Sequence, residues 1–221
     1  MEWYQYAIAI IGGAVAGGIN TLAGNGSAIT LTILTEVIGL PGNLANGTNR
    51  VGVLTQSTAG SWAFYKHGKL NFTNSKLHLS MTILGAIIGV WTAIQVSNEQ
   101  FLFVFKYLML GMFVVLLVKP KRWLREGTSE RRVNIWLAIP LFLALGFYGG
   151  FIQMGMGIFY LATMVLVARY SIIEGNALKS FVVAAYTLIV VAIFQYKGLI
   201  RWDVELIMAC LLYTSPSPRD N

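Results

Sequence analysis

Long apolar runs separated by short polar loops dominate the chain. Four of these runs, 43–65, 77–96, 99–118 and 175–196, reach the roughly 20 residues that a helix needs to cross the hydrocarbon core of a bilayer. The pattern therefore predicts four membrane-spanning helices.

Two further apolar stretches, 4–38 and 133–168, follow a different pattern. Each has about 35 residues, which is too long for one helix and too short for two full spans with a turn. Glycine interrupts each stretch near its middle, in "AGNGS" (23–27) and in "QMGMGI" (153–158). These stretches predict pairs of half-length helices that meet at a break.

Three groups of residues occur twice in the same order, displaced by about 130 positions. The first is a Gly-Gly pair followed by Gly-x-Gly, the second opens a predicted span, and the third follows that span. The matching segments are "AGGINTLAGNGSAITL" (16–31) with "YGGFIQMGMGIFYL" (148–161), "ANGTNR" (45–50) with "EGNALK" (174–179), and "YKHGKLNF" (65–72) with "QYKGLIRW" (195–202). Three matches in order indicate an internal duplication, which is common in secondary transporters.

The sequence thus predicts an all-α, polytopic membrane protein with two related repeats. Each repeat opens with a glycine-broken or re-entrant helix pair, and spanning helices follow. The first repeat covers 1–118, a basic cytoplasmic linker covers 119–132, and an incomplete second repeat covers 133–209. If the broken segments re-enter, the first repeat has three full spans and the second repeat is inverted. If the broken segments cross the bilayer, the repeats are parallel.

The last segment, 210–221, does not continue the second repeat. Its residues "CLLYTSPSPRD" (210–220) match the in-frame translation of a transposase sequencing adapter over eleven consecutive codons. We therefore expect the native sequence to depart from this one after Ala209, so that two spans of the second repeat are missing. The alternative is an ordinary polar tail.

Composition agrees with a membrane protein. The 221 residues are 56% hydrophobic and only 11% charged, against about a quarter charged in a soluble domain. The net charge is +7, and the loop 119–132 holds six basic and two acidic residues, while 65–76 holds three lysines and no acid. The positive-inside rule places both loops in the cytoplasm, so the charge does not indicate nucleic-acid binding.

Residues for catalysis or metal binding are scarce. Cys210 is the single cysteine, and His67 and His78 are the two histidines. The sequence has no Ser-His-Asp pattern, nucleotide-binding loop or metal-ligand cluster, so no enzyme activity, cofactor, metal or primary pump is expected. Lys106 falls inside the 99–118 run. Its side chain either snorkels to the membrane surface or takes part in transport.

The repeated motifs resemble the TauE/SafE family of sulfite exporter-like membrane transporters. The residues that carry this resemblance are "LAGNGS" (22–27), "ANGTNR", "YKHGKLNF" and their second copies, and it covers about residues 5–209. The resemblance implies export or uptake of small anions, such as sulfite, organosulfonates, thiosulfate-like species or organic acids. It also implies a multi-pass protein of the bacterial plasma (inner) membrane.

The glycine breaks form the predicted binding site. A break leaves backbone N–H and C=O groups unpaired, so in a membrane it must face protein or a wet cavity. A half-helix that begins near Ser27 would direct its N–H groups and positive dipole end at this cavity and attract an anion. The alternative is that the glycines allow close helix packing. The residues expected to contact substrate are Asn20, Thr21, Gly24, Asn25, Gly26, Ser27, Asn46, Thr48, Asn49, Gln153, Gly155, Gly157, Asn176 and Lys179.

Two cations, Arg50 and Lys179, lie near the starts of predicted spans. A positive charge at a helix start opposes the helix dipole, so each of them needs a compensating role. They attract an anionic substrate, form a charge pair such as Glu174 with Lys179, or anchor their helices at the membrane interface.

The leading functional hypothesis is a secondary transporter that moves a small anion by alternating access around the paired breaks. The alternatives are a membrane scaffold or assembly subunit, and a channel-like anion conductor with a fixed filter. The expected partners are the anion, the lipid bilayer and a coupling ion, H+ or Na+. A homo-oligomer is compatible with the sequence, and no nucleic-acid partner is expected.

Overall fold

The computed structural model contains helices and no strands in the part of the chain that it describes. The described residues are 8, 10–13, 15–16, 26–72, 75–117 and 135–204. The predicted linker 119–132 and the predicted tail 210–221 lie outside them, and these two predictions stay predictions.

Four helices occupy the predicted spans. They are α3 (Gly42–Lys66), α4 (Lys76–Ala93), α5 (Asn98–Leu117) and α8 (Ile172–Tyr196), and each end lies within three residues of its predicted position. Among the described helices, α4 and α8 are long and apolar enough to cross a membrane by length and composition. The hydrophobic pattern therefore locates the long helices correctly.

The second broken stretch has the break that its glycines predict. Helix α6 (Ile135–Phe151) ends and α7 (Met156–Leu166) begins after a short turn. Gln153 and Gly155 in this turn adopt left-handed backbone conformations, with φ of 63° and 68°, which a right-handed helix cannot contain. With 11 residues, α7 is about 17 Å long, roughly half of the hydrocarbon thickness.

The first broken stretch ends in a comparably short helical segment. Helix α2 (Gly26–Thr32) continues into one π-helical turn, η1 (Ile33–Val37). Gly26 and Ser27 are therefore the first residues of α2. The rest of the predicted break, 23–25, lies outside the described residues.

Backbone features recur at the offset of 130 residues that the sequence repeats predict. Helices α3 and α8 both have 25 residues. Gly39 and Arg169, 130 residues apart, have left-handed φ of 74° and 58°, and Gly68 and Gly198 have φ of 65° and 66°. The hydrogen bonds that close α2–η1 and α7 also match, with Leu40 N to Leu34 O and Tyr170 N to Met164 O both 2.9 Å long.

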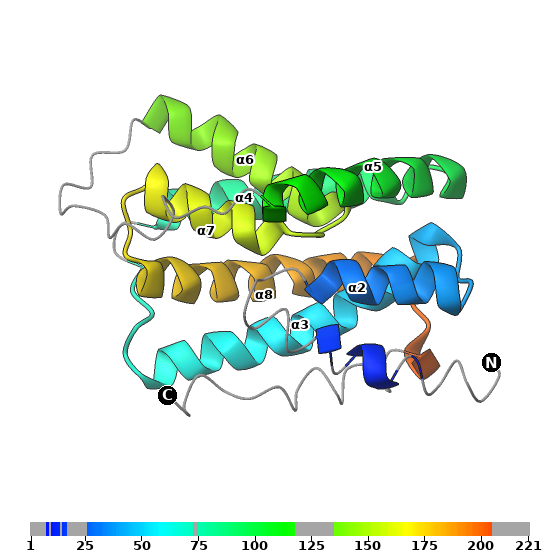
Figure 1. Ribbon diagram of the computed structural model, residues 1–221. Helices are drawn as coiled ribbons and strands as arrows, with labels where there is room; N and C mark the ends of the chain where they lie inside the picture. The colour runs from blue at the N-terminus through cyan, green and yellow to red at the C-terminus, as the bar shows by residue number, and fades with distance from the viewer. Residues whose placement is uncertain are drawn as a thin grey trace.

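Helices α3 and α8 pack side by side in opposite directions (Figure 1). A Cβ added to Gly47, early in α3, would lie 2.0 Å from the carbonyl oxygen of Leu199, just after α8. A Cβ added to Gly60, late in α3, would lie 3.5 Å from Oγ of Ser180, early in α8. The two helices that match at an offset of 130 residues are therefore antiparallel.

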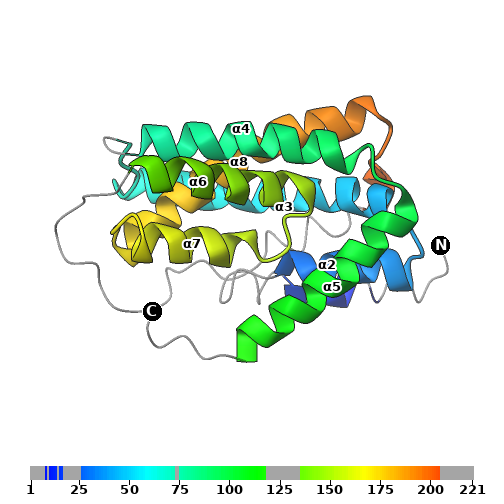
Figure 2. The ribbon, with the colours of Figure 1, turned by 90° about the horizontal axis from the view of Figure 1, so that it is seen from above.

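Helices α4 and α6 form the closest helix pair and run parallel (Figure 2). Gly85 and Gly89 of α4 face α6, while Gly146 and Gly150 of α6 face α4. A Cβ added at any of these four positions would lie 2.0–2.1 Å from a carbonyl oxygen of the other helix. Small residues spaced four apart on both helices thus bring the two backbones into contact.

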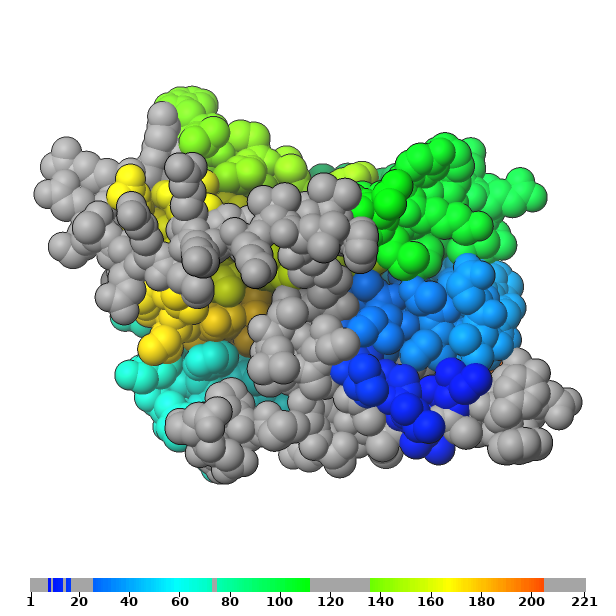
Figure 3. Space-filling view, in the orientation of Figure 1, coloured from blue at the N-terminus to red at the C-terminus, as the bar shows by residue number. Residues whose placement is uncertain are grey.

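Helix α5 crosses the molecule obliquely, away from α4 and α6 (Figure 2). The surface view shows α5 next to α2 and η1 on one face (Figure 3). Here Thr32 Oγ1 lies 3.4 Å from Met109 Sδ. Lys106 is exposed on α5, as a snorkelling side chain requires.

Large apolar side chains are exposed and one charged side chain is fully buried, in addition to the apolar core. Trp136 is 86% exposed and Trp62 is 60% exposed, whereas Arg50 is completely buried. Large apolar side chains face outward on most of the long helices, where lipid would cover them. Polar side chains, by contrast, gather inside, around the first half of α3.

We expect Gly146→Ala to destabilise the protein. The added methyl group would meet the carbonyl oxygen of Thr82, and backbone atoms cannot move aside as a flexible side chain can. Overpacking of this kind costs about 1–3 kcal/mol or more. Gly111→Ala is the matched control, because it has the same gain in helix propensity and a Cβ there meets nothing within 4 Å. Equal thermal midpoints for the two variants in detergent would contradict this packing.

Candidate functional site

The break between α6 and α7 is held by two side chains of α3. Asn46 and Arg50 are one helical turn apart and therefore lie on the same face. Asn46 Nδ2 donates to the carbonyl oxygen of Phe151 at 2.8 Å. Arg50 donates from Nη1 to Gly149 O at 2.5 Å and from Nη2 to Gly150 O at 2.9 Å. These are the last carbonyls of α6, which the helix itself leaves without donors.

Gln153 completes the contact with Arg50. Its left-handed backbone turns the side chain so that Oε1 accepts a hydrogen bond from Arg50 Nη1. Tyr148 Oη donates to the carbonyl oxygen of Met154 in the same turn. The carbonyl groups freed by the break thus find donors inside the protein, which is the condition for a helix break at membrane depth.

A third side chain of α3 reaches the start of α2. Thr30 Oγ1 donates to Asn49 Oδ1 at 2.5 Å, and Asn49 Nδ2 donates to Ser27 O at 3.5 Å. Gly26, Ser27 and Thr30 are buried in the first turns of α2. One segment of α3, residues 46–50, therefore contacts both the start of α2 and the α6–α7 break.

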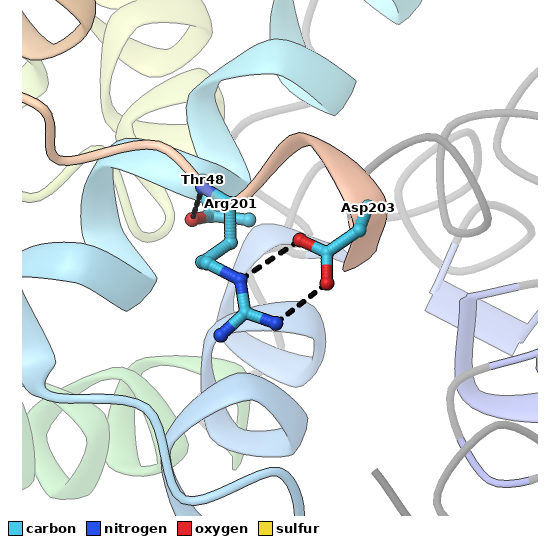
Figure 4. A network of polar contacts seen from close by, with 3 residues as sticks. All are labelled: Thr48, Arg201 and Asp203. Atoms are coloured by element: carbon cyan, nitrogen blue, oxygen red, sulfur yellow. Dashed lines mark hydrogen bonds and ion pairs between the residues drawn. The ribbon is translucent and has the colours of Figure 1, made fainter.

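Thr48 binds the chain that follows α8 (Figure 4). The backbone N–H of Arg201 donates to Thr48 Oγ1 at 3.0 Å. The Arg201 guanidinium also forms a two-point ion pair with Asp203, with Nε to Oδ1 at 2.8 Å and Nη2 to Oδ2 at 2.5 Å. Hydrogen bonding from Arg201 lowers the pKa of the Asp203 carboxyl to about 2.

Asn176 and Lys179 lie apart from the contacts around residues 46–50. Lys179 Nζ donates to Asn176 Oδ1 at 2.8 Å in the first turns of α8. Because α8 is antiparallel to α3, this part of α8 lies near Gly60. About 15 Å of helix separates Arg50 from Gly60, at 1.5 Å per residue. The structure thus places the two sets of predicted residues toward opposite ends of the α3–α8 pair.

The structure describes ten of the fourteen predicted substrate residues; Asn20, Thr21, Gly24 and Asn25 lie outside it. Gly155 is the N-cap of α7, and Gly157 lies in its first turn. Thr30 and Tyr148 take part in these contacts and were missing from the prediction. In the sequence, Thr30 falls in the first repeated segment and Tyr148 directly precedes the second Gly-Gly pair.

In the described part of the chain, no group of three or more His, Cys, Asp or Glu side chains lies close enough together to hold a metal ion. The polar groups gathered at the breaks are instead amides, hydroxyls and a guanidinium, which bind anions and backbone carbonyls.

The sequence pattern of the family described as "Sulfite exporter TauE/SafE" matches residues 9–215. The chain belongs to the sulfite exporter TauE/SafE family. The TauE/SafE match includes both glycine breaks and the helices α2 to α8, and its last residues overlap the predicted tail.

Curated relatives of this TauE/SafE protein are named as transporters. A probable membrane transporter protein, ORF9, from Sinorhizobium sp is 22% identical over 209 residues, which are 94% of this chain and 79% of the relative. The probable membrane transporter protein YfcA from Escherichia coli K12 is 24% identical, over 88% of this chain and 71% of YfcA. A probable membrane transporter protein from Haemophilus influenzae is 26% identical, over 91% of this chain and 78% of the relative. No solved structure matches the chain.

We expect Asn46→Ala to destabilise the α6–α7 break. The change removes the donor to Phe151 O, and an unpaired buried carbonyl costs about 1–3 kcal/mol. Ser80→Ala is the control, because the Ser80 hydroxyl is exposed and bonds only the Lys76 carbonyl of its own helix. Thermal unfolding in detergent should show a lower midpoint for Asn46→Ala alone, and equal midpoints would contradict the role of Asn46.

We expect acid to weaken the Arg201–Asp203 pair only at very low pH. Because the folded pKa of Asp203 lies below its ordinary value, the pair contributes fully above about pH 4 and is lost as the pH falls through about 2. An NMR titration of the Asp203 carboxyl should give this low midpoint. Arg201→Gln should return the midpoint toward the ordinary value, and an unchanged midpoint would exclude Arg201 as the cause.

Proposed function

We propose that the protein is a secondary transporter that moves small anions by alternating access around its paired helix breaks. The observation that carries the proposal is the α6–α7 break, where the buried Arg50 guanidinium meets the freed carbonyls and Gln153. Membership of a transporter family and the transporter names of the relatives support it. Of the described Arg, Lys, His, Asp and Glu side chains, Arg50 is the one that is fully buried, and its positive charge favours an anion as the cargo.

We further propose that the two repeats are inverted. The sequence leaves parallel and inverted repeats open. Two observations favour inversion: α3 and α8 match at an offset of 130 residues, and they are antiparallel. Inverted repeats around a central site are a common basis of alternating access, because each half can adopt the conformation of the other.

The substrate class follows from the family description and from the charge of the site. The family description names sulfite, and we propose sulfite, organosulfonates or related sulfur-containing or organic acid anions as cargo. The names of the relatives specify no substrate. Lys179, half-buried on α8, is a second cation that an anion could approach from the opposite end of the α3–α8 pair.

The proposed location of the protein is the bacterial plasma (inner) membrane, which several of its helices cross. The sequence has no nucleotide-binding loop, so the energy for transport comes from an ion gradient of H+ or Na+, from a partner protein, or from the gradient of the substrate itself.

The test is anion flux into proteoliposomes that contain the purified protein. A transporter gives saturable, anion-dependent flux, a channel gives current that does not saturate, and a scaffold gives neither. Gly26→Leu should abolish flux while the protein still folds, because Gly26 is buried at the start of α2. Gly111→Leu, at an open position on α5, should retain flux. Unchanged flux in Gly26→Leu would exclude the start of α2 from the transport site.

A further inference from the structure

Arg50 carries a buried positive charge with only neutral partners. Its side chain is 0% exposed, and its three acceptors are two backbone carbonyls and the Gln153 amide oxygen. In the described residues no carboxylate forms an ion pair with it; the ion pair found there joins Arg201 and Asp203. The effective penalty for burying an ion is several kcal/mol, so such a group usually has an opposite charge beside it.

The end of α6 compensates only part of this charge. A helix C-terminus is equivalent to roughly half a negative charge, which the Gly149 and Gly150 carbonyls present to Arg50. In addition, the Nε–H of Arg50 is buried without any acceptor. The site therefore retains both a surplus of positive charge and an unused donor, and an anion would supply what is missing.

One of the three acceptors of Arg50, the Gln153 amide oxygen, belongs to a side chain that can rotate away from the guanidinium. The carbonyls of Gly149 and Gly150 belong to the backbone of α6, which packs against the backbone of α4. Gln153, by contrast, contacts Arg50 through a flexible side chain and stands in the turn between two helices. Its left-handed φ of 63° is unfavourable for a residue with a side chain, so release of the side chain from Arg50 would let this backbone strain relax.

We propose that the Gln153 amide oxygen occupies the position of a substrate oxygen, and that a small oxyanion displaces it from Arg50. The inference rests on the proposed function and adds the anion-binding residue and its internal competitor. Binding then exchanges a neutral acceptor for a charged one, and charge-assisted hydrogen bonds are roughly twice as strong. Displacement also releases Gln153, so that anion binding and the conformation of the α6–α7 break are coupled. A ligand shifts a conformational equilibrium only through such a difference in contacts.

The experiment compares two substitutions of Gln153 that change the competitor in opposite directions. Sodium sulfite, and sodium acetate as a second oxyanion, are titrated against the full chain in detergent, with the thermal midpoint as the readout of binding. Gln153→Glu attaches a carboxylate opposite Arg50, so the protein should fold and the apparent Kd for sulfite should rise about tenfold or more. Gln153→Ala removes the competitor, so the apparent Kd should fall by about threefold or more.

The matched control is Gln95→Glu. Gln95 is exposed and its side chain bonds the Trp91 carbonyl, so Gln95→Glu introduces the same charge away from Arg50 and should leave the sulfite response unchanged. If Gln153→Glu keeps the wild-type Kd, or if Gln153→Ala does not lower it, Arg50 and Gln153 only support the break and the inference is wrong. If neither anion raises the thermal midpoint of the wild type, the proposed transport of these two anions is wrong, and this inference is wrong as well.

Discussion

A helix that stops inside a bilayer leaves carbonyl groups that lipid cannot satisfy, and the rest of this structure depends on how α3 satisfies them. Asn46 and Arg50 donate to the last three carbonyls of α6 from one face of one helix. Asn49, on the neighbouring face, binds the start of α2. A single stretch of α3 therefore supports both broken segments, and a movement of this stretch would change the contacts of both.

Much of the fold could be predicted from hydrophobic length and glycine position. The run 175–196 gives α8, because about 20 apolar residues in sequence have few alternatives to a long helix. The run 43–65 is more polar, and it also forms one long helix, α3. Gly155 marks the second break because left-handed backbone favours glycine. Hydropathy is the same in either direction along a helix, so it does not predict that α3 and α8 are antiparallel; this contact depends on tertiary packing.

The site was harder to predict than the fold. Asn46, Asn49 and Gln153 were expected on polarity alone, and the structure places each at a broken segment. The sequence gives no sign that Arg50 would bind carbonyls more than 90 positions away, because such a contact depends on how α3 lies against α6. The sequence also does not predict the left-handed backbone of Gln153, because a glutamine rarely adopts that conformation without tertiary constraint.

The glycine contact between α4 and α6 has a consequence for how such a molecule can move. Helix α4 belongs to the first half of the sequence and α6 to the second, yet their backbones touch along two turns. Two surfaces that interlock this closely slide or separate only at great cost. In a transport cycle that preserves this contact, α4 and α6 would move together as one rigid body. That body would then contain helices from both halves of the sequence.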